Sequence, residues 1–444
     1  MGTMPEAADL KPRRRRVGWR KSVLALTAGT AALVVAVPTT AGAAASLNTG
    51  ASVSAAAKYK KNGSFKVKSQ DFGIHAYQTK PEIPAGTIRI AGAPSWLQVQ
   101  PTKGTWDWSL MDTSLDRAKA WGLSEVLVAI FGTPQWAGSN VKDPASEIQG
   151  PRSTSAPVKM SDWKTYITEL VKKYGDRISA YQIWNEATSP QFYQGSPKKL
   201  AAMTKSASKI IKKYDPSAAV VASSVQTHRQ NWFDAFAPSF FKQLKKKKWP
   251  VDVLSGHFYP ALDAGPNARV GQIEMFHRTA DKAGAPKRLQ RWDTETNFDL
   301  GSHASTGKNL DGRVRGNKAA WYVGRTFLDS WRLGLRKTYW YLWTQNYNDF
   351  PGIQMYQANQ PGPTAYRTLA NWTVGQAFKG CKTKGKLVNC KFKKSGNTSN
   401  VLYTTGGKAN YKFSGRKQVC KVNGAACSSE RKKIKVTKMP VRVS

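Results

Sequence analysis

Residues 181–188 read YQIWNEAT, an apolar run that ends in an amide and a carboxylate. The YQIW part is typical of a buried strand, and Asn185 and Glu186 follow it directly. A carboxylate at the end of a buried strand is costly unless it has a partner or a function. A glutamate that merely begins the next helix is the simpler structural interpretation, so the rest of the chain must decide between the two.

Seven other short apolar runs alternate with amphipathic segments such as SDWKTYITELVKKYG (161–175), in which apolar residues recur three and four positions apart. The eight runs are FGIHAY (72–77), TIRIAG (87–92), SEVLVAIFG (124–132), ISAYQIWN (178–185), AAVVASS (218–224), VDVLSGHFYP (251–260), RLQRWDTETN (288–297) and TYWYLWTQ (338–345). Eight such alternations predict an α/β fold, a (β/α)₈ TIM barrel over residues 69–370. A doubly wound open sheet is the competing fold, but no glycine-rich phosphate loop follows the first run.

The first 43 residues have the order of a secretory signal peptide. Seven basic residues precede the apolar stretch VLALTAGTAALVVAV (23–37), and small residues follow up to a cleavage site near Ala43. A single N-terminal anchor helix is the alternative, and the arginine pairs leave twin-arginine export open beside the general route. No later stretch is long and apolar enough to span a bilayer, so we expect a secreted or cell-wall-associated protein. Residues 44–68, rich in Ala, Ser, Lys and Gly, are predicted to form a flexible leader.

Residues 371–444 differ from the rest of the chain, because short β-like runs are separated there by Gly, Asn and Ser turns. They are predicted to form a small all-β module, a β-sandwich, and they hold all four cysteines. Cys381 with Cys390 and Cys420 with Cys427 is the simplest of three possible disulfide pairings. A zinc site is less favoured, because the cysteines lack C-x-x-C spacing and an accompanying histidine.

The chain carries a formal net charge of +42, and because the first 43 residues contribute +5, +37 remain after cleavage. Residues 371–444 contain 18 Lys or Arg against the single acidic residue Glu430, and Lys245–Lys248 adds a further cluster. Such a surface attracts polyanions. Nucleic acid is the first partner that this suggests, but the export signal argues against it and favours anionic cell-wall polymers or acidic glycans. Simple solubility in salt or acid is the alternative explanation.

In barrels of this type the functional side chains gather at the C-terminal ends of the strands. Glu186 ends the fourth run and Glu295 the seventh, so the two carboxylates can face each other across the barrel mouth. Two carboxyl groups about 5 to 5.5 Å apart are what retaining glycoside hydrolysis requires, whereas a wider separation admits a water and leads to inversion. A surface glutamate paired with Lys or Arg is the plain alternative for Glu295 taken alone.

The elements IWNEA, HFYP, WDTETN and YWYLW, in this order, resemble the large clan of retaining (β/α)₈ glycosidases over residues 72–370. Further stretches, RIAGAPSWLQVQPTKGTWDWSLMD, FGTPQWA and TETN, are most similar to glycoside hydrolase family 39 and its bacterial relatives, and family 5 shares much of them. The resemblance implies that Glu186 is the general acid/base and Glu295 the nucleophile. The chain departs from the clan at Ala187, where a proline often follows the Asn-Glu pair. It also departs in its abundance of lysine, which puts a neutral plant-type glycan substrate in doubt.

The same resemblance implies roles for Asn185, Tyr259, Arg89 and Trp343, and His257, His75 and Trp136 are further candidates for the site. Asn185 would bind the sugar 2-hydroxyl, Tyr259 would orient the nucleophile, and Arg89 would help to keep it charged. His257 and His75 fit hydrogen-bonding roles in the pocket, although an isolated histidine near a strand is more often structural. Trp343 and Trp136 would stack on sugar rings, or else simply pack in the barrel.

The sequence therefore predicts a secreted retaining glycoside hydrolase that cleaves a polysaccharide by double displacement. No metal or cofactor is expected, because no ligand cluster is visible in the sequence. The competing class is a non-catalytic carbohydrate- or polyanion-binding cell-wall protein on the same barrel, against which the presence of both glutamates argues.

Overall fold

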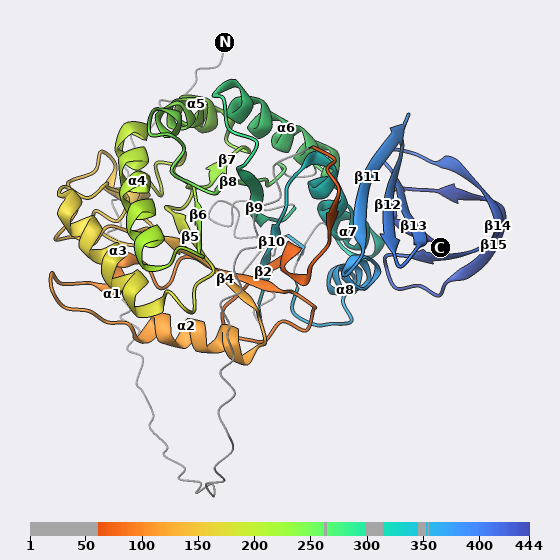
Figure 1. Ribbon diagram of the computed structural model, residues 1–444, viewed down its shortest axis with the longest axis horizontal. Coiled ribbons are helices and arrows are strands. Elements are labelled where there is room, and N and C mark those ends of the chain that lie inside the picture. Colours follow the sequence, from red (N-terminus) through yellow and green to blue (C-terminus); the bar gives the residue numbers. More distant parts are fainter. Residues whose placement is uncertain (1–60, 262–263, 299–313, 345–351, 354) are drawn as a thin grey trace, which may run out of the picture. The chain divides into compact units, whose positions relative to one another are not determined.

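The computed structural model describes residues 61–261, 264–298, 314–344, 352–353 and 355–444 (Figure 1). The predicted signal peptide and most of the predicted leader lie outside these residues. Within the leader, β1 (Phe65–Lys66) pairs with β11 (Ala377–Lys384), and the Phe65 ring lies 5.2 Å from that of Phe378. Phe65 is thus held by apolar contacts, and the bounds of the leader stay a prediction. No helix in the described part of the chain is long and apolar enough to cross a membrane.

All eight predicted strands form, and they make a closed parallel barrel. They are β2 (Phe72–Ala76), β3 (Thr87–Ile90), β4 (Glu125–Ile130), β5 (Ala180–Ile183), β6 (Ala219–Val221), β8 (Val253–His257), β9 (Gln290–Thr296) and β10 (Thr338–Trp343). The strands pair in the order β6-β5-β4-β3-β2-β10-β9-β8, and Val221 opposite Val253 joins β6 to β8 and closes the ring. A two-residue strand, β7 (Val225–Gln226), continues from β6 along the end of β8. The predicted barrel is confirmed.

Helices lie outside the ring of strands, as Figure 1 shows for α3 to α6. The helices are α1 (Trp96–Val99), α2 (Ser109–Ala120), α3 (Met160–Tyr174), α4 (Pro197–Tyr214), α5 (Gln230–Lys246), α6 (Pro266–Lys282), α7 (Gly316–Leu333) and α8 (Pro361–Thr373), with short 3₁₀ turns at Ser69–Asp71 and Pro144–Ser146. Their apolar stripes pack on the strands, as the sequence period predicts. The beginning of α4 has a local cause: the Ser196 side chain accepts a hydrogen bond from the amide of Lys199, and Pro197 occupies the first turn.

The barrel interior is apolar at one level and polar above it. Side chains from several strands form a small buried cluster inside the ring, made of Leu127, Ala180, Ala219, Val221, Val253, Trp292 and Tyr339. Three polar residues lie two positions beyond Ala180, Val253 and Trp292 on the same strands; they are Gln182, Ser255 and Thr294. All three are buried, and Gln182 donates a hydrogen bond to each of the other two. Because side chains on a strand alternate between its two faces, these residues also point inward. They form a polar layer between the apolar cluster and the barrel mouth.

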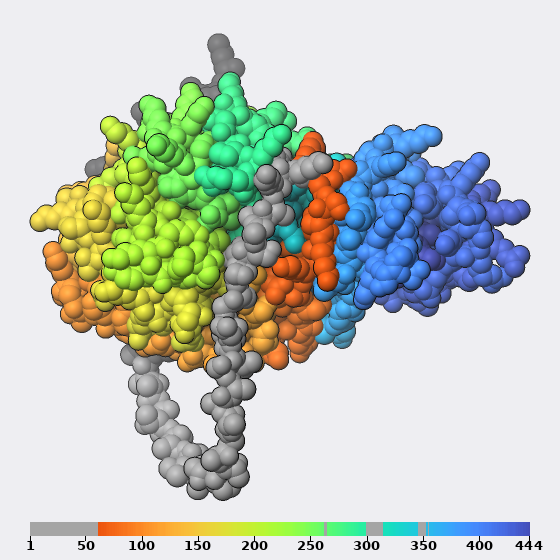
Figure 2. Space-filling model, viewed as in Figure 1, coloured from red at the N-terminus to blue at the C-terminus, as the bar shows by residue number. Residues whose placement is uncertain are grey.

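The C-terminal strands, blue in Figures 1 and 2, form a separate antiparallel sheet together with β1. Besides β1 and β11 its strands are β12 (Leu387–Lys394), β13 (Asn397–Thr404), β14 (Ala409–Lys421), β15 (Ser428–Val436) and β16 (Val441–Val443), in the order β1-β11-β12-β13-β16-β14-β15. The disulfides Cys381–Cys390 and Cys420–Cys427 are both present, which confirms the predicted pairing. The boundary at residues 370 and 371 stays a prediction.

Helix α7 carries the contact between the barrel and this sheet. Trp331, fully buried, lies with its ring 6.1 Å from Phe378 and 6.2 Å from Phe392. Tyr403 on β13 donates a hydrogen bond of 2.5 Å to Asp329, a buried carboxylate of α7. The contact is therefore closely packed and contains a satisfied buried charge, as a contact within one compact unit does.

Candidate active site

The chain turns sharply after β5, and this turn aims Glu186. Trp184 and Glu186 have φ angles of 77° and 44°, in the left-handed region that non-glycine residues adopt at some cost. The amide of Glu186 donates to the Ser224 hydroxyl at 2.9 Å, and the amide of Ala187 to the Ser223 hydroxyl at 3.4 Å. Proline at position 187 would lack that second donor. The serines after β6 therefore hold the glutamate backbone in place.

A local irregularity in β9 positions the second glutamate. Gly256 of β8 lies opposite Asp293, but the next residue, His257, lies opposite Glu295, so Thr294 is an extra residue in the pairing. A bulge of this kind rotates the side chains that follow it. Asp293 is ion-paired with Arg269 of α6 at 2.5 Å, outside the barrel, whereas Thr294 and Glu295 both contact the inward-facing His257.

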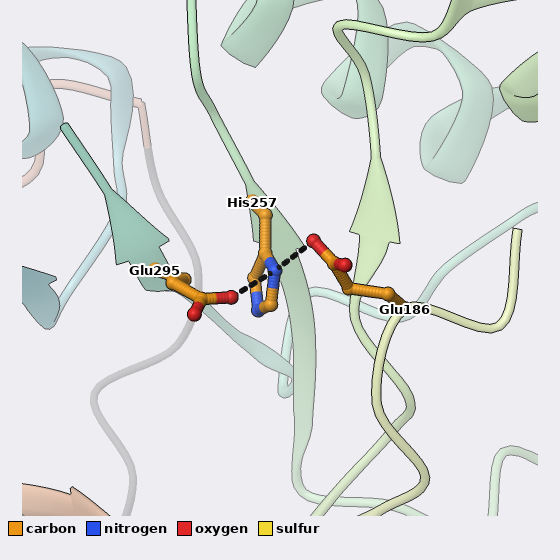
Figure 3. Close-up of side chains that lie close together, drawn as sticks. All are labelled: Glu186, His257 and Glu295. Carbon is orange, nitrogen blue, oxygen red and sulfur yellow. Dashed lines mark hydrogen bonds and ion pairs between the residues drawn. The ribbon is translucent and has the colours of Figure 1, made fainter. Parts of the chain in front are cut away.

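His257 lies between the two glutamates (Figure 3). Its Nδ1 is 2.6 Å from Glu186 Oε1 and 2.7 Å from Glu295 Oε2, and its Nε2 is 3.1 Å from the Thr294 hydroxyl. The contacting atoms of the three side chains all lie within 4.8 Å of one another. This spacing is on the retaining side of the two glycosidase geometries, since inversion needs carboxyl groups about 6.5 to 9.5 Å apart.

The polar layer below the glutamates holds a buried cation. Arg89 donates through Nε to Gln182 at 2.8 Å and through Nη2 to Asn185 at 2.7 Å, and its Nη1 lies 3.8 Å from Glu295 Oε2. Gln182 in turn donates to Ser255 and Thr294 at 2.9 and 3.2 Å. The guanidinium therefore fixes the Asn185 side chain and places a positive charge beside Glu295.

These contacts shift the pKa values of Glu295, His257 and His75 in different directions. Burial would raise the pKa of Glu295, but His257 and then Arg89 outweigh it and lower the pKa to about 2. Burial would lower the pKa of His257, but the charges of Glu295 and Glu186 raise it above its ordinary 6.5. For His75, burial and then the charge of Arg89 lower the pKa to about 3, so that imidazole is neutral.

The remaining predicted site residues lie at different places. His75 is buried, with its Nε2 3.0 Å from the Thr294 carbonyl. The Tyr259 ring is perpendicular to that of His257 at 6.4 Å, and burial followed by the charge of Glu295 raises the pKa of its hydroxyl. Trp343 is 2% exposed at the end of β10, and Trp136 is half-buried and donates to the Gln100 carbonyl. The stacking roles of both tryptophans stay predictions.

Other residues at the site were not identified from sequence. Gln182 and Thr294 link Arg89 to His257 through hydrogen bonds. In the sequence, each is an ordinary polar residue inside a predicted strand. Tyr77 is also missed: its hydroxyl donates to the Ala91 carbonyl at 3.1 Å, and burial and then the charge of Glu295 raise its pKa to about 12. Its only sequence signal is that it follows the first strand, where functional groups gather.

Two carboxylates and an imidazole can also bind a metal ion. The three side chains satisfy the distance requirement, all ligand atoms being within 4.8 Å. However, His257 uses the same nitrogen toward both glutamates, and Arg89 already supplies a positive charge 3.8 Å from Glu295. A metal ion would have to displace this hydrogen-bonded arrangement, so the residues fit acid–base chemistry better than metal binding.

No protein-family model matches the chain, and no curated protein matches its sequence. Solved structures do match its fold. A family 39 glycoside hydrolase from Bacteroides cellulosilyticus WH2 aligns with a TM-score of 0.61 at 15% identity, over 85% of this chain and 82% of that one. Xyn30A, a family 30 subfamily 8 xylanase from Clostridium acetobutylicum, aligns with a TM-score of 0.58 at 12% identity, over 88% and 97%.

Cel44A, a family 44 endoglucanase from Clostridium thermocellum, aligns with a TM-score of 0.56 at 13% identity, over 86% of this chain and 97% of that one. At such identities the similarity establishes the fold alone. The chain thus shares the fold of these glycoside hydrolases.

Proposed function

We propose that the protein is a secreted retaining glycoside hydrolase that cleaves a polysaccharide. The observation that carries this proposal is the pair Glu186 and Glu295, whose side chains share His257 at the barrel mouth with contacting oxygens within 4.8 Å. Two carboxyl groups that close are suited to a covalent glycosyl intermediate. The glycoside hydrolases that share the fold support the same reaction class.

Glu295 acts as the nucleophile. A nucleophilic carboxylate must be ionised, and His257 and Arg89 favour the charged form in a buried site. One Glu295 oxygen attacks the anomeric carbon, the bond from that carbon to the leaving oxygen breaks, and a glycosyl ester forms. The bulge in β9 aims this carboxylate inward.

Glu186 acts first as acid and then as base. In the first step it gives its proton to the leaving oxygen, and in the second it takes a proton from the water that attacks the anomeric carbon and releases Glu295. Asn185, held by Arg89, is placed to bind the sugar hydroxyl next to the anomeric carbon. Tyr259 and Trp343 keep the roles that the family resemblance implies, and His75 and Trp136 are proposed to contact the sugar by hydrogen bonding and by stacking.

The finer features of the proposal rest on the sequence. Export follows from the N-terminal signal pattern, and the two disulfides are consistent with an oxidising compartment. The excess of basic residues favours attachment to anionic cell-wall polymers, and the substrate is an extended glycan at the wall or outside it.

The test is intact-mass analysis after incubation with activated 2-fluoro glycosides of several sugars. The wild type should gain the mass of one fluorosugar, mapped to Glu295 by peptide analysis, whereas Glu295→Gln should gain none. Glu274→Gln, on α6 and outside the site, is the matched control and should be labelled like the wild type. An adduct on any other residue, or equal labelling of Glu295→Gln, would contradict the assignment of the nucleophile.

A further inference from the structure

The two faces of the C-terminal sheet differ in content. Val441 and Val443 pack with Val419 in an apolar cluster on one face. Between them Arg442 lies opposite Val401 and Cys420 and therefore points to the other face. That second face packs on the barrel over β11 to β13, through Phe378 and Phe392 among others.

Further along the sheet, the second face becomes basic. On β14 and β15, Tyr411, Phe413 and Ile434 pack against the apolar cluster, so the alternate residues point to the second face. We call the basic residues of this face the basic face; they are Lys394, Lys412, Arg416, Arg431, Lys433, Lys435 and Arg442. All except Arg442 are exposed.

One end of the basic face is a polar cavity of about 340 Å³, the size of a pocket for a small ligand. Lys394 and Arg442 line it together with the hydroxyl and amide groups of Asn397, Ser399 and Gln376. The cavity wall is held by hydrogen bonds, because the Ser399 hydroxyl donates to Gln376, whose amide donates to the Trp372 carbonyl.

The two cations of this cavity lack a counter-ion. In the described part of the chain no carboxylate lies within 4.0 Å of a nitrogen of Lys394 or Arg442, and Nε of Arg442 is buried without a hydrogen-bond partner. The only acidic residue after position 370, Glu430, lies opposite Lys417 on the β14–β15 hairpin. A partly buried guanidinium with a free donor gains a charge-assisted hydrogen bond when an anion enters.

Along β14 and β15 like charges face each other. Lys412 lies directly opposite Lys433, and Arg416 opposite Arg431. Such cross-strand pairs destabilise a hairpin. The two pairs are two residues apart on β15, which corresponds to about 6.8 Å along the strand. A chain of negative groups laid along this row would relieve the repulsion at each step.

We propose that the basic face binds an acidic polysaccharide, with one carboxylate or phosphate of the polymer in the cavity and the following groups along β14 and β15. The hydroxyl and amide groups beside the two cations suit sugar hydroxyls. Nucleic acid fits less well, because Tyr411 and Phe413 point to the opposite face and leave bases no ring to stack on along this row. This site is separate from the barrel mouth and independent of the proposed catalysis.

The test uses the full chain carrying Glu295→Gln, so that hydrolysis does not disturb binding. Affinity is measured by titration calorimetry in 150 mM NaCl for polygalacturonate, phosphomannan, dextran and duplex DNA. At least one acidic polysaccharide should bind while dextran does not, and the stronger of the two identifies the preferred anion. Raising the salt should weaken binding, because exposed charges are screened.

Lys394→Gln with Arg442→Gln should lower the affinity at least tenfold. The matched control is Lys391→Gln with Lys393→Gln, which removes the same charge from exposed residues on the opposite face of β12 and should change affinity less than twofold. If the first pair lowers the melting temperature, Lys394→Gln alone replaces it and must still weaken binding threefold. Equal losses in both pairs, no binding to either acidic polysaccharide, or tighter binding to DNA would each overturn the proposal.

Discussion

His257 is the residue on which both glutamates converge. A single imidazole nitrogen lies within 2.7 Å of an oxygen of each carboxylate, so His257 is in contact with Glu186 and Glu295 at once. The resulting charge on His257 keeps Glu295 ionised although its side chain is only 13% exposed. The histidine is thus a positioning residue whose charge sets the protonation of its neighbour.

Replacing His257 should therefore change the pH dependence of the reaction. With a pKa of about 2, Glu295 is ionised throughout the working range. In His257→Gln the partner that lowers this pKa is lost while burial remains, so the acidic limb of kcat/KM should move to higher pH by about one to two units. The pH profile on an activated aryl glycoside measures this. His75→Gln, which removes a neutral imidazole, should move the limb much less; an unmoved limb in His257→Gln would contradict the role.

Single residues were predictable where strand position alone implied chemistry. Glu186 and Glu295 follow apolar runs, and a charge there is costly without a use. Gln182 and Thr294 lie inside such runs, and their roles depend on which strands lie side by side across the barrel, which no local pattern contains.

At the scale of single elements, the strands and disulfides followed from local patterns, but two departures from regular structure did not. The bulge that makes Thr294 an extra residue, and the left-handed backbone at Glu186, both occur in ordinary-looking sequence. Packing against β8 and the serines after β6 imposes them, because tertiary contacts outweigh the local cost. Regular alternation along β9 would not have predicted that Thr294 and Glu295 both contact His257.

The hairpin of β14 and β15 allows a test at this scale. Lys433→Glu would place a carboxylate opposite Lys412 and turn a repulsive pair into an attractive one, so the free energy of unfolding should rise by about 0.2 to 1 kcal/mol. Urea unfolding measures it. Lys391→Glu, opposite the neutral Asn400, makes the same charge change and is the control. Equal stabilisation by both would show that total charge, rather than this pair, is responsible.

At the scale of the whole molecule, barrel and sheet share one compact unit. Trp331 is fully buried where it meets the sheet, and β1, which precedes the barrel in sequence, belongs to the sheet. The fold thus joins its two parts both through packing and through chain connectivity. This packing keeps the basic face attached to the barrel.

Gly324 in α7 tests this joint. A methyl group there would lie 3.1 to 3.2 Å from Val422 and Pro440 of the sheet, so Gly324→Ala should gain helix propensity but lose more through crowding, by about 1 kcal/mol net. Gly271 in α6 has open space around it, and Gly271→Ala should stabilise by about 1 kcal/mol. Thermal unfolding compares them. Equal stabilisation by both would mean that α7 and the sheet are not closely packed.

The sequence by itself determined the alternation of strands and helices, the local disulfides, the excess of positive charge and the two glutamates, because each is a matter of period, short spacing or composition. The tertiary structure alone decided that one nitrogen of His257 contacts both glutamates, that Arg89 also holds Gln182 and Asn185, and that Lys394, Arg442 and the β14–β15 pairs share one face. These facts depend on pairing register and on contacts between residues far apart in the chain. Chain closure and packing fix both, and no local stretch of sequence records them.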